Sequence, residues 1–141
     1  PTADGLWAMA PERLSAVDVA TLPYPGIATD YKPLFVALLA VADGVGIVTE
    51  NIFSGRFRYV DELVRMGADG RTDAHHGVVR GKQQLSGAPV RAPDIRAGAA
   101  LVVAGLRAEG ETEVFGAEHI DRGYENFVAK LAAVGADVSR E

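Results

Sequence analysis

Residues 119–125, His-Ile-Asp-Arg-Gly-Tyr-Glu, place an acid, an arginine and an aromatic side chain in a turn just before an expected helix. An arginine at such a place presents a fixed fork of N–H donors beside a helix N-terminus, where the helix dipole adds positive potential. This combination suits a carboxylate or a phosphate. Arg122 is therefore the first candidate for an anion-binding residue.

Two further arginines, Arg56 and Arg96, also lie at or just before expected helix starts. If they converge with Arg122, the three side chains would bind a small dianion or a ligand that carries both a carboxylate and a phosphate. The ordinary alternative is that each arginine pairs with a surface acid and contributes little. The spacing of the residues alone leaves both interpretations open.

Asp30 could act as a general base beside such a cluster of arginines. From the residues alone, however, Thr29 and Asp30 are better interpreted as the N-cap of a helix. Asp94 presents the same choice and is interpreted as a cap. Asp121 is interpreted as a residue that orients Arg122 or caps the next helix.

The sequence predicts no metal ion and no cofactor. It contains no cysteine, and it has neither a Cys/His ligand pair nor a glycine-rich phosphate loop in the right context. His75 and His76 are neighbours on an expected strand, so they should point to opposite faces and not share one ion. His119 is expected to be a packed side chain near the arginines.

Length and charge limit the possible classes of protein. At 141 residues, with 48% hydrophobic residues, the chain is long enough for one domain with a substantial core. Its net charge of −5 argues against a nucleic-acid partner or a membrane surface, and no apolar run is long enough to span a bilayer. We therefore expect a cytoplasmic protein. No secretion signal opens the chain. It begins at Pro1 and not at a methionine, as a processed chain or a piece of something longer would.

An internal repeat organises the chain. Asp30, an apolar run, Arg56 and a Gly-Ala-Asp string recur in the same order as Asp94, an apolar run, Arg122 and a second Gly-Ala-Asp string. The period, roughly 65 residues, exceeds that of short-repeat solenoids and indicates a duplicated α/β unit. We expect part of one domain (1–141) made of units at about 14–81 and 85–141.

Each unit is predicted to run β-α-β-α-β-β, although the second stops one or two strands short. Strands are expected at residues 16–21, 46–52, 74–80, 88–92 and 111–115. The first helix of each unit, at residues 34–42 and 97–106, is apolar on every face and should be buried all round. The second is amphipathic, with faces made by Val60, Leu63 and Val64 and by Phe127, Val128, Leu131 and Ala132. The predicted fold class is α/β, with helices inside and sheets outside.

Several strings together resemble the UDP-N-acetylglucosamine 1-carboxyvinyltransferase family of enolpyruvyl transferases. The most specific are Arg-Met-Gly-Ala at residues 65–68 and the string at 119–125. The others are Ala-Thr-Asp at 28–30, Glu-Asn-Ile-Phe at 50–53, Arg-Phe at 56–57, Leu-Ser-Gly-Ala at 85–88 and Asp-Ile-Arg-Ala at 94–97. The resemblance implies an inside-out α/β barrel fold, of which this chain would be the C-terminal third, about two repeat units.

The resemblance also implies roles for individual residues. Asp30 matches the proposed general base that contacts the sugar 3-hydroxyl, and Ile52 matches a residue whose backbone meets the UDP-sugar. Arg96 and Arg122 match arginines that engage phosphoenolpyruvate or the tetrahedral intermediate, and Arg56 matches a third arginine that lines the cleft. The implied reaction adds the sugar hydroxyl to C2 of phosphoenolpyruvate and then expels phosphate, the first committed step of bacterial peptidoglycan synthesis.

Other functional residues of that family would lie outside this chain. The expected partners are UDP-N-acetylglucosamine, phosphoenolpyruvate and the missing N-terminal part of the same enzyme, and the isolated chain is expected to be inactive. Two alternatives remain. One is a transferase like 5-enolpyruvylshikimate-3-phosphate synthase, with a different acceptor, and the other is a non-catalytic domain of the same fold.

Overall fold

The computed structural model describes residues 5, 7, 9, 12–53 and 55–141, which form a layered α/β structure. The strands are β1 (Val19–Ala20), β2 (Val45–Thr49), β3 (Asp69–Asp73), β4 (His76–Arg80), β5 (Leu85–Ser86), β6 (Pro89–Arg91), β7 (Ala108–Glu109) and β8 (Glu113–Phe115). The helices are the 3₁₀ helix η1 (Thr29–Tyr31), α1 (Lys32–Leu39), α2 (Arg58–Arg65), α3 (Ile95–Gly105), α4 (Glu118–Asp121) and α5 (Phe127–Ala133). No helix in the described part of the chain is both long and apolar enough to cross a membrane.

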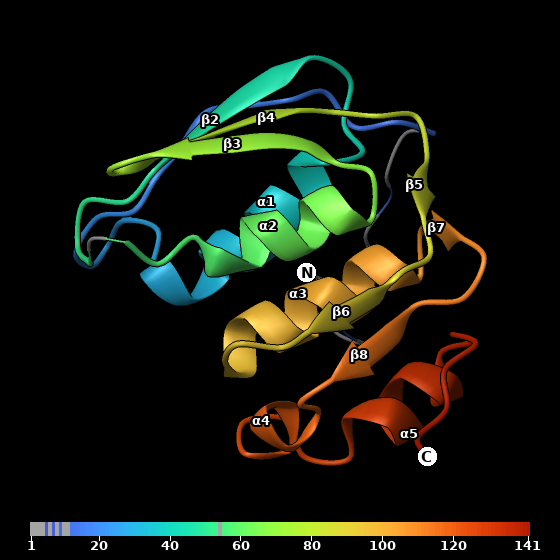
Figure 1. Ribbon diagram of the computed structural model, residues 1–141. Helices are drawn as coiled ribbons and strands as arrows, with labels where there is room; N and C mark the ends of the chain where they lie inside the picture. The colour runs from blue at the N-terminus through green and yellow to red at the C-terminus, as the bar shows by residue number, and fades with distance from the viewer. Residues whose placement is uncertain (1–4, 6, 8, 10–11, 54) are drawn as a thin grey trace.

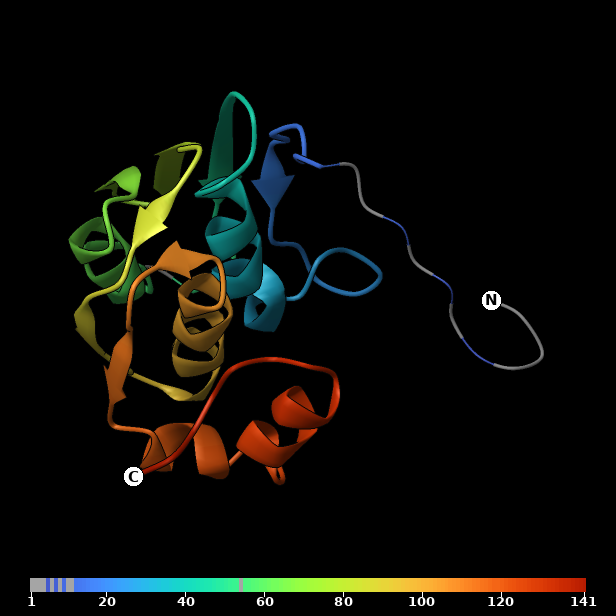
Figure 2. The same cartoon turned by 90° about the vertical axis from the view of Figure 1, so that its right-hand side faces the viewer.

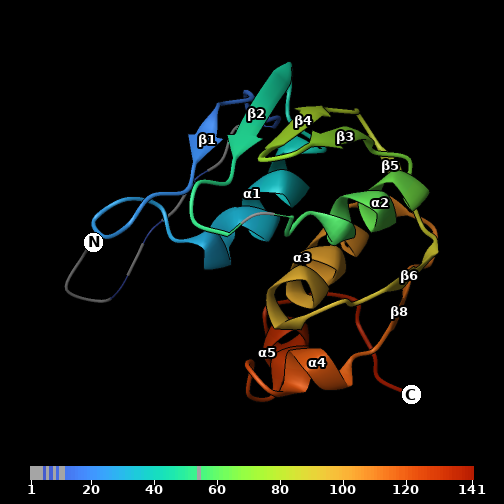
Figure 3. The same cartoon turned by 60° about the vertical axis from the view of Figure 1, so that its left-hand side comes forward.

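A sheet with the strand order β1-β2-β4-β3 lies over a layer formed by α1, α2 and α3 (Figure 1). Strands β5 to β8 flank α3 as two separate pairs, β5 with β7 and β6 with β8. The same layers can be followed from the side in Figure 3, where α4 and α5 lie at the end farthest from the four-stranded sheet. The predicted α/β class, with helices inside and sheets outside, is confirmed.

Each half of the chain contains an equivalent pair of parallel strands. Strand β1 runs parallel to β2 with Val19 opposite Val48, and β6 runs parallel to β8 with Val90 opposite Val114. In the first half, β2 continues into an antiparallel ladder with β4, which forms a hairpin with β3. The unit boundaries at 14–81 and 85–141 stay a prediction.

The first helix of each half is buried to a different degree. Helix α3 buries Ala97, Leu101 and Ala104 and lies in the middle of the molecule, as Figure 2 shows. Helix α1 also lies in the core, but Leu38 on one side is 43% exposed. The prediction that both helices are buried all round is therefore wrong for α1, because no other element among the described residues covers that side.

The helix caps follow the prediction in only one of the two halves. Asp94 caps α3, since its Oδ1 accepts the N–H groups of Arg96 and Ala97 at 2.9 and 3.0 Å. Neither η1 nor α1 has a side-chain cap, so the interpretation of Thr29 and Asp30 as an N-cap is wrong. These two side chains bond to partners elsewhere in the fold.

The amphipathic helices also differ from their predicted faces. Helix α2 buries Tyr59, Val60 and Leu63, whereas Val64 is 43% exposed. Helix α5 has no buried residue, so its predicted apolar face is only partly covered. Strand β3 covers α2, and no equivalent strand covers α5 among the described residues.

Gly98 allows α4 to pack closely on α3. A Cβ atom at Gly98 would lie 2.7 Å from Cγ1 of Ile120 and 2.9 Å from the Cβ of Ala92. Both distances are shorter than ordinary carbon–carbon contacts, which lie near 3.5–4.0 Å. The absence of a side chain at Gly98 therefore sets the distance between these helices.

We expect Gly98→Ala in the full-length gene product to lower the free energy of unfolding by about 1–2 kcal/mol. The overpacking at Ile120 should outweigh the gain of about 1 kcal/mol that alanine has over glycine inside a helix. Urea unfolding measures the change. The double variant Gly98→Ala with Ile120→Ala should be less destabilised than the two single changes predict together. An unchanged or higher stability of Gly98→Ala would contradict the close packing.

Candidate functional site

A cavity of about 410 Å³ opens where three helix starts meet. The start of α1 and the segment leading into α2 come from the first half of the chain, and the start of α3 comes from the second. The cavity is lined by Thr29, Lys32, Pro33, Gly55, Arg56, Arg58, Tyr59, Pro93, Asp94 and Arg96. Four of these residues are cationic and one is anionic, so the cavity has a positive potential that favours an anionic ligand.

Arg96 and Asp30 form an ion pair across the two halves of the chain. The Nε of Arg96 lies 2.5 Å from Oδ1 of Asp30, and their side chains are 40% and 56% exposed. Arg96 occupies the first turn of α3, where the cap by Asp94 fixes its backbone. Because exposed ion pairs contribute little to stability, the main consequence of this one is to place the carboxylate of Asp30 beside a guanidinium that lines the cavity. Asp30 itself is not one of the lining residues.

Arg56 reaches the cavity from the segment before α2. Its guanidinium lies 4.0 Å from the ring centroid of Phe53, a cation–π contact that holds the side chain over the turn at Ile52 and Phe53. The backbone N–H of Ile52 donates to Oε1 of Glu50 at 2.9 Å, and the side chain is 39% exposed. Ile52 thus belongs to a turn that adjoins the cavity without lining it.

Arg122 does not lie where the sequence suggests. It is the C-cap of α4, a short helix that the sequence analysis missed, so it stands at a helix end and not at a helix start. It is exposed and does not line the cavity. Its neighbour Gly123 packs closely against Ile95, the residue before Arg96. The structure therefore brings Arg56 and Arg96 to one cavity and holds Arg122 on an adjoining segment.

A buried ion pair that sequence reasoning missed lies behind the cavity. The Nζ of Lys32 is 2.8 Å from Oε2 of Glu50, and the two side chains are 2% and 0% exposed. Nζ also lies 4.1 Å from the ring centroid of Phe57. The sequence does contain a signal for this pair, because Lys32 begins an otherwise apolar helix and Glu50 directly follows a half-buried strand. Charges in such places are rarely buried without a partner.

The surroundings of Glu50 favour its charged form. Burial alone would raise the pKa of Glu50, but hydrogen bonds from Lys32, Thr21 and Thr29 and from the Ile52 N–H together hold it below its usual range. Burial lowers the pKa of Lys32, and the contact with Glu50 opposes that effect. Glu50 is therefore a carboxylate at neutral pH, with hydrogen-bond donors on both oxygens.

The phenol of Tyr59 is kept neutral at the floor of the cavity. Burial raises its pKa, and the negative charges of Glu50 and Asp94 raise it further. Tyr59 therefore cannot supply a phenolate at ordinary pH, and it can only donate or accept a hydrogen bond there.

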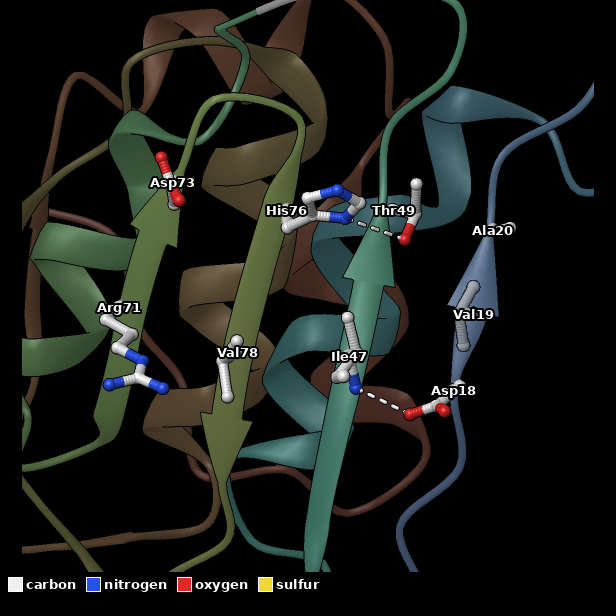
Figure 4. Close-up of a pocket in the computed structure, with 9 residues that line it drawn as sticks. All are labelled: Asp18, Val19, Ala20, Ile47, Thr49, Arg71, Asp73, His76 and Val78. Atoms are coloured by element: carbon white, nitrogen blue, oxygen red, sulfur yellow. Dashed lines mark hydrogen bonds between the residues drawn. The ribbon is translucent and has the colours of Figure 1, made fainter.

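A second hollow, of about 770 Å³, lies on the outer face of the four-stranded sheet (Figure 4). It is lined by Asp18, Val19, Ala20, Ile47, Thr49, Arg71, Asp73, His76 and Val78. His76 contacts the hydroxyl of Thr49 there at 3.0 Å, whereas His75 lies in the hairpin turn near the carbonyl of Glu50. This hollow is larger than the cavity, but it contains none of the candidate residues.

The chain matches known enolpyruvyl transferases in sequence. The model of the family described as EPSP synthase (3-phosphoshikimate 1-carboxyvinyltransferase) matches residues 2–131. The UDP-N-acetylglucosamine 1-carboxyvinyltransferase of Mycobacterium leprae (strain TN) is 59% identical over 129 residues, which are 92% of this chain and 31% of that protein. The protein of the same name from Nocardia farcinica (strain IFM 10152) is 56% identical over 137 residues, 97% of this chain and 32% of that protein. The chain thus spans under one third of the length of these relatives.

Solved structures also resemble the fold. The enolpyruvyl transferase NikO from Streptomyces tendae matches 89% of this chain and 29% of its own, with a TM-score of 0.81 and 31% sequence identity. An EPSP synthase from Acinetobacter baumannii matches 94% of this chain and 29% of its own, with a TM-score of 0.65 and 23% identity. The second likeness concerns the fold alone.

Glu50 should make the stability of the protein depend on pH in the acid range. Because its pKa is lower in the folded state than the usual 4.5, its stabilisation is complete above pH 4.5 and is lost as the pH falls below that value. One such carboxylate changes the free energy of unfolding by at most about 1.4 kcal/mol per pH unit. Urea unfolding between pH 7 and pH 3 should therefore show a shallower acid loss in Glu50→Gln than in the parent.

Asp43→Asn is the control for this measurement, because Asp43 forms an ion pair with Arg13 but its side chain is 78% exposed. It should keep the acid slope of the parent. Equal acid slopes in the parent and in Glu50→Gln would contradict the stabilisation of the buried charge.

Proposed function

This chain belongs to the EPSP synthase family of enolpyruvyl transferases, and on that premise we propose that it is part of a UDP-N-acetylglucosamine 1-carboxyvinyltransferase. The reaction adds the 3-hydroxyl of UDP-N-acetylglucosamine to C2 of phosphoenolpyruvate and then eliminates phosphate. The observation that carries the proposal is the high identity with transferases of that name over nearly the whole chain. The cation-lined cavity supports it, since phosphoenolpyruvate carries a phosphate and a carboxylate.

Asp30 is the proposed general base for the acceptor hydroxyl. It forms an ion pair with Arg96, so a phosphate or carboxylate that binds Arg96 competes with Asp30 for the guanidinium. Binding of the substrate anion would then free the carboxylate to accept a proton beside the reacting hydroxyl. This competition links the arrival of phosphoenolpyruvate to the activation of the acceptor.

Arg56, Arg96 and Arg122 are the proposed residues for phosphoenolpyruvate and the intermediate. Fixed guanidinium groups suit this reaction because negative charge must be held on phosphate and carboxylate while the bond to C2 forms. Arg56 and Arg96 line the cavity. The segment that carries Arg122 packs on α3 through the contact of Gly123 with Ile95. Ile52 is proposed to meet the UDP-sugar through its backbone.

The rest of the enzyme is the proposed partner of this chain. The relatives that match are about three times as long, so their other parts would contribute the remaining wall of the active site. We expect these 141 residues alone to release no phosphate. In the cell, the reaction would take place in the cytoplasm and begin peptidoglycan synthesis, on which cell shape and division depend.

A second candidate differs in the acceptor. The matching family model is described by the 3-phosphoshikimate reaction, which uses the same enolpyruvyl donor. Phosphate release with 3-phosphoshikimate but not with UDP-N-acetylglucosamine would favour this candidate. Release with neither acceptor would favour a non-catalytic domain of the same fold.

We expect Asp30→Asn in the full-length gene product to lower kcat for phosphate release by about 10²–10⁴-fold, the usual loss when a general base is removed. Binding of UDP-N-acetylglucosamine, measured by calorimetry, should persist. Asp69→Asn is the control, because Asp69 also forms a half-exposed ion pair with an arginine, Arg80, on the hairpin away from the cavity. Equal activity of Asp30→Asn and Asp69→Asn would rule out a chemical role for Asp30.

A further inference from the structure

The carboxylate of Glu50 joins segments that are far apart in the sequence. Its Oε1 accepts the hydroxyl of Thr21 at 2.6 Å and the backbone N–H groups of Ile52 and Phe53 at 2.9 and 3.1 Å. Its Oε2 accepts the hydroxyl of Thr29 at 2.6 Å and lies 2.8 Å from Nζ of Lys32. One oxygen thus binds the end of β1 and the turn after β2, and the other binds η1 and the start of α1.

These bonds reach the two segments that carry the acceptor residues. Thr29 directly precedes Asp30, and both lie in η1. The N–H of Ile52 is itself one of the donors. The distance between the Asp30 segment and the Ile52 turn is therefore set through a single side chain, which is fully buried.

The second half of the chain shows that the fold does not need this charge. Thr21 N donates to Thr49 O at 2.9 Å in the first half, and Ala92 N donates to Phe115 O at 2.8 Å at the equivalent place in the second. The residue after Phe115, equivalent to Glu50, is a glycine, and Ala92 replaces Thr21. The same strand pairing forms there without a buried carboxylate, so the network of Glu50 belongs to the site and not to the repeated unit.

We propose that Glu50 is a positioning residue, whose buried carboxylate fixes the Thr29–Asp30 segment and the Ile52–Phe53 turn relative to each other, so that both meet the acceptor substrate in one geometry. This inference rests on the function proposed above. Lys32 makes the arrangement possible, since it compensates the buried charge and is held in place by the ring of Phe57.

The positioning should act on the acceptor and not on phosphoenolpyruvate. The backbone of Arg96 is fixed by the cap of α3, and its half-exposed ion pair with Asp30 contributes little to holding it. Arg56 contacts Phe53, whose N–H bond to Oε1 of Glu50 does not involve Thr29. The hydroxyl of Thr29, in contrast, links Glu50 directly to η1, which carries Asp30, whereas Lys32 links it to the start of α1. Loss of this hydroxyl should therefore displace Asp30 relative to Ile52.

Thr29→Val tests this link, because it removes the hydroxyl and keeps the size and branching of the side chain. In the full-length gene product we expect kcat to fall and KM for UDP-N-acetylglucosamine to rise, each by about tenfold, as the loss of a hydrogen bond to a charged group allows. KM for phosphoenolpyruvate should stay within about twofold. Thr29→Ser restores a hydroxyl and should recover most of the activity.

Thr49→Val is the matched control. The hydroxyl of Thr49 bonds to His76 on the outer face of the sheet, next to Glu50 in the chain but outside its network. Its kinetic constants should equal those of the parent. A loss of folded protein alone would lower the apparent kcat in either variant without changing either KM, so urea unfolding of both variants accompanies the kinetics.

Three outcomes separate the possibilities. If the parent releases phosphate and Thr29→Val has the same kinetic constants as Thr49→Val, the positioning role is overturned and the proposed function remains intact. An equal rise in KM for both substrates would also overturn it, because the effect would not be specific to the acceptor. A parent that releases no phosphate with UDP-N-acetylglucosamine would overturn the proposed function, and this inference with it.

Discussion

The burial of Glu50 is the constraint from which the geometry of the site follows. A carboxylate in a protein interior costs several kcal/mol unless a cation and hydrogen-bond donors replace the lost water. Here Lys32, two hydroxyl groups and two backbone N–H groups do so. Each donor must therefore stay within hydrogen-bond distance of the same two oxygens. The end of β1, the start of α1 and the turn after β2 consequently have little freedom to move independently.

The exposed ion pair beside the cavity differs in its effect from the buried pair behind it. Asp30 and Arg96 are about half exposed, so their attraction is screened by water and adds little to stability. The same exposure leaves both groups open to a ligand, which an ion pair in the core would not allow. A rigid buried pair beside an accessible pair gives the cavity both a fixed shape and charged groups that a substrate can reach.

The structural features that could be predicted are those that depend only on residues close together in the sequence. The cap by Asp94 needs only the next three residues, and the apolar run of α3 already indicates a buried helix. Asp30 was misinterpreted because its partner, Arg96, lies in the other half of the chain. The start of an otherwise apolar helix indicates that Lys32 is buried with a partner, but the residues around it do not identify that partner, which lies 18 positions away. Only the folded chain brings Glu50 beside it.

Arg122 is a proposed site residue that does not line the cavity. Its helix, α4, has only four residues, which is too few for a hydrophobic period, so the helix could not be predicted from the sequence. In the structure Ile120 fits against Gly98, and Gly123 packs on Ile95, so α4 is fixed to the first turns of α3. Arg96 extends from that same part of α3. The separation between Arg96 and Arg122 is therefore set by helix packing, and a ligand that spans both arginines would meet two donors held by one rigid element.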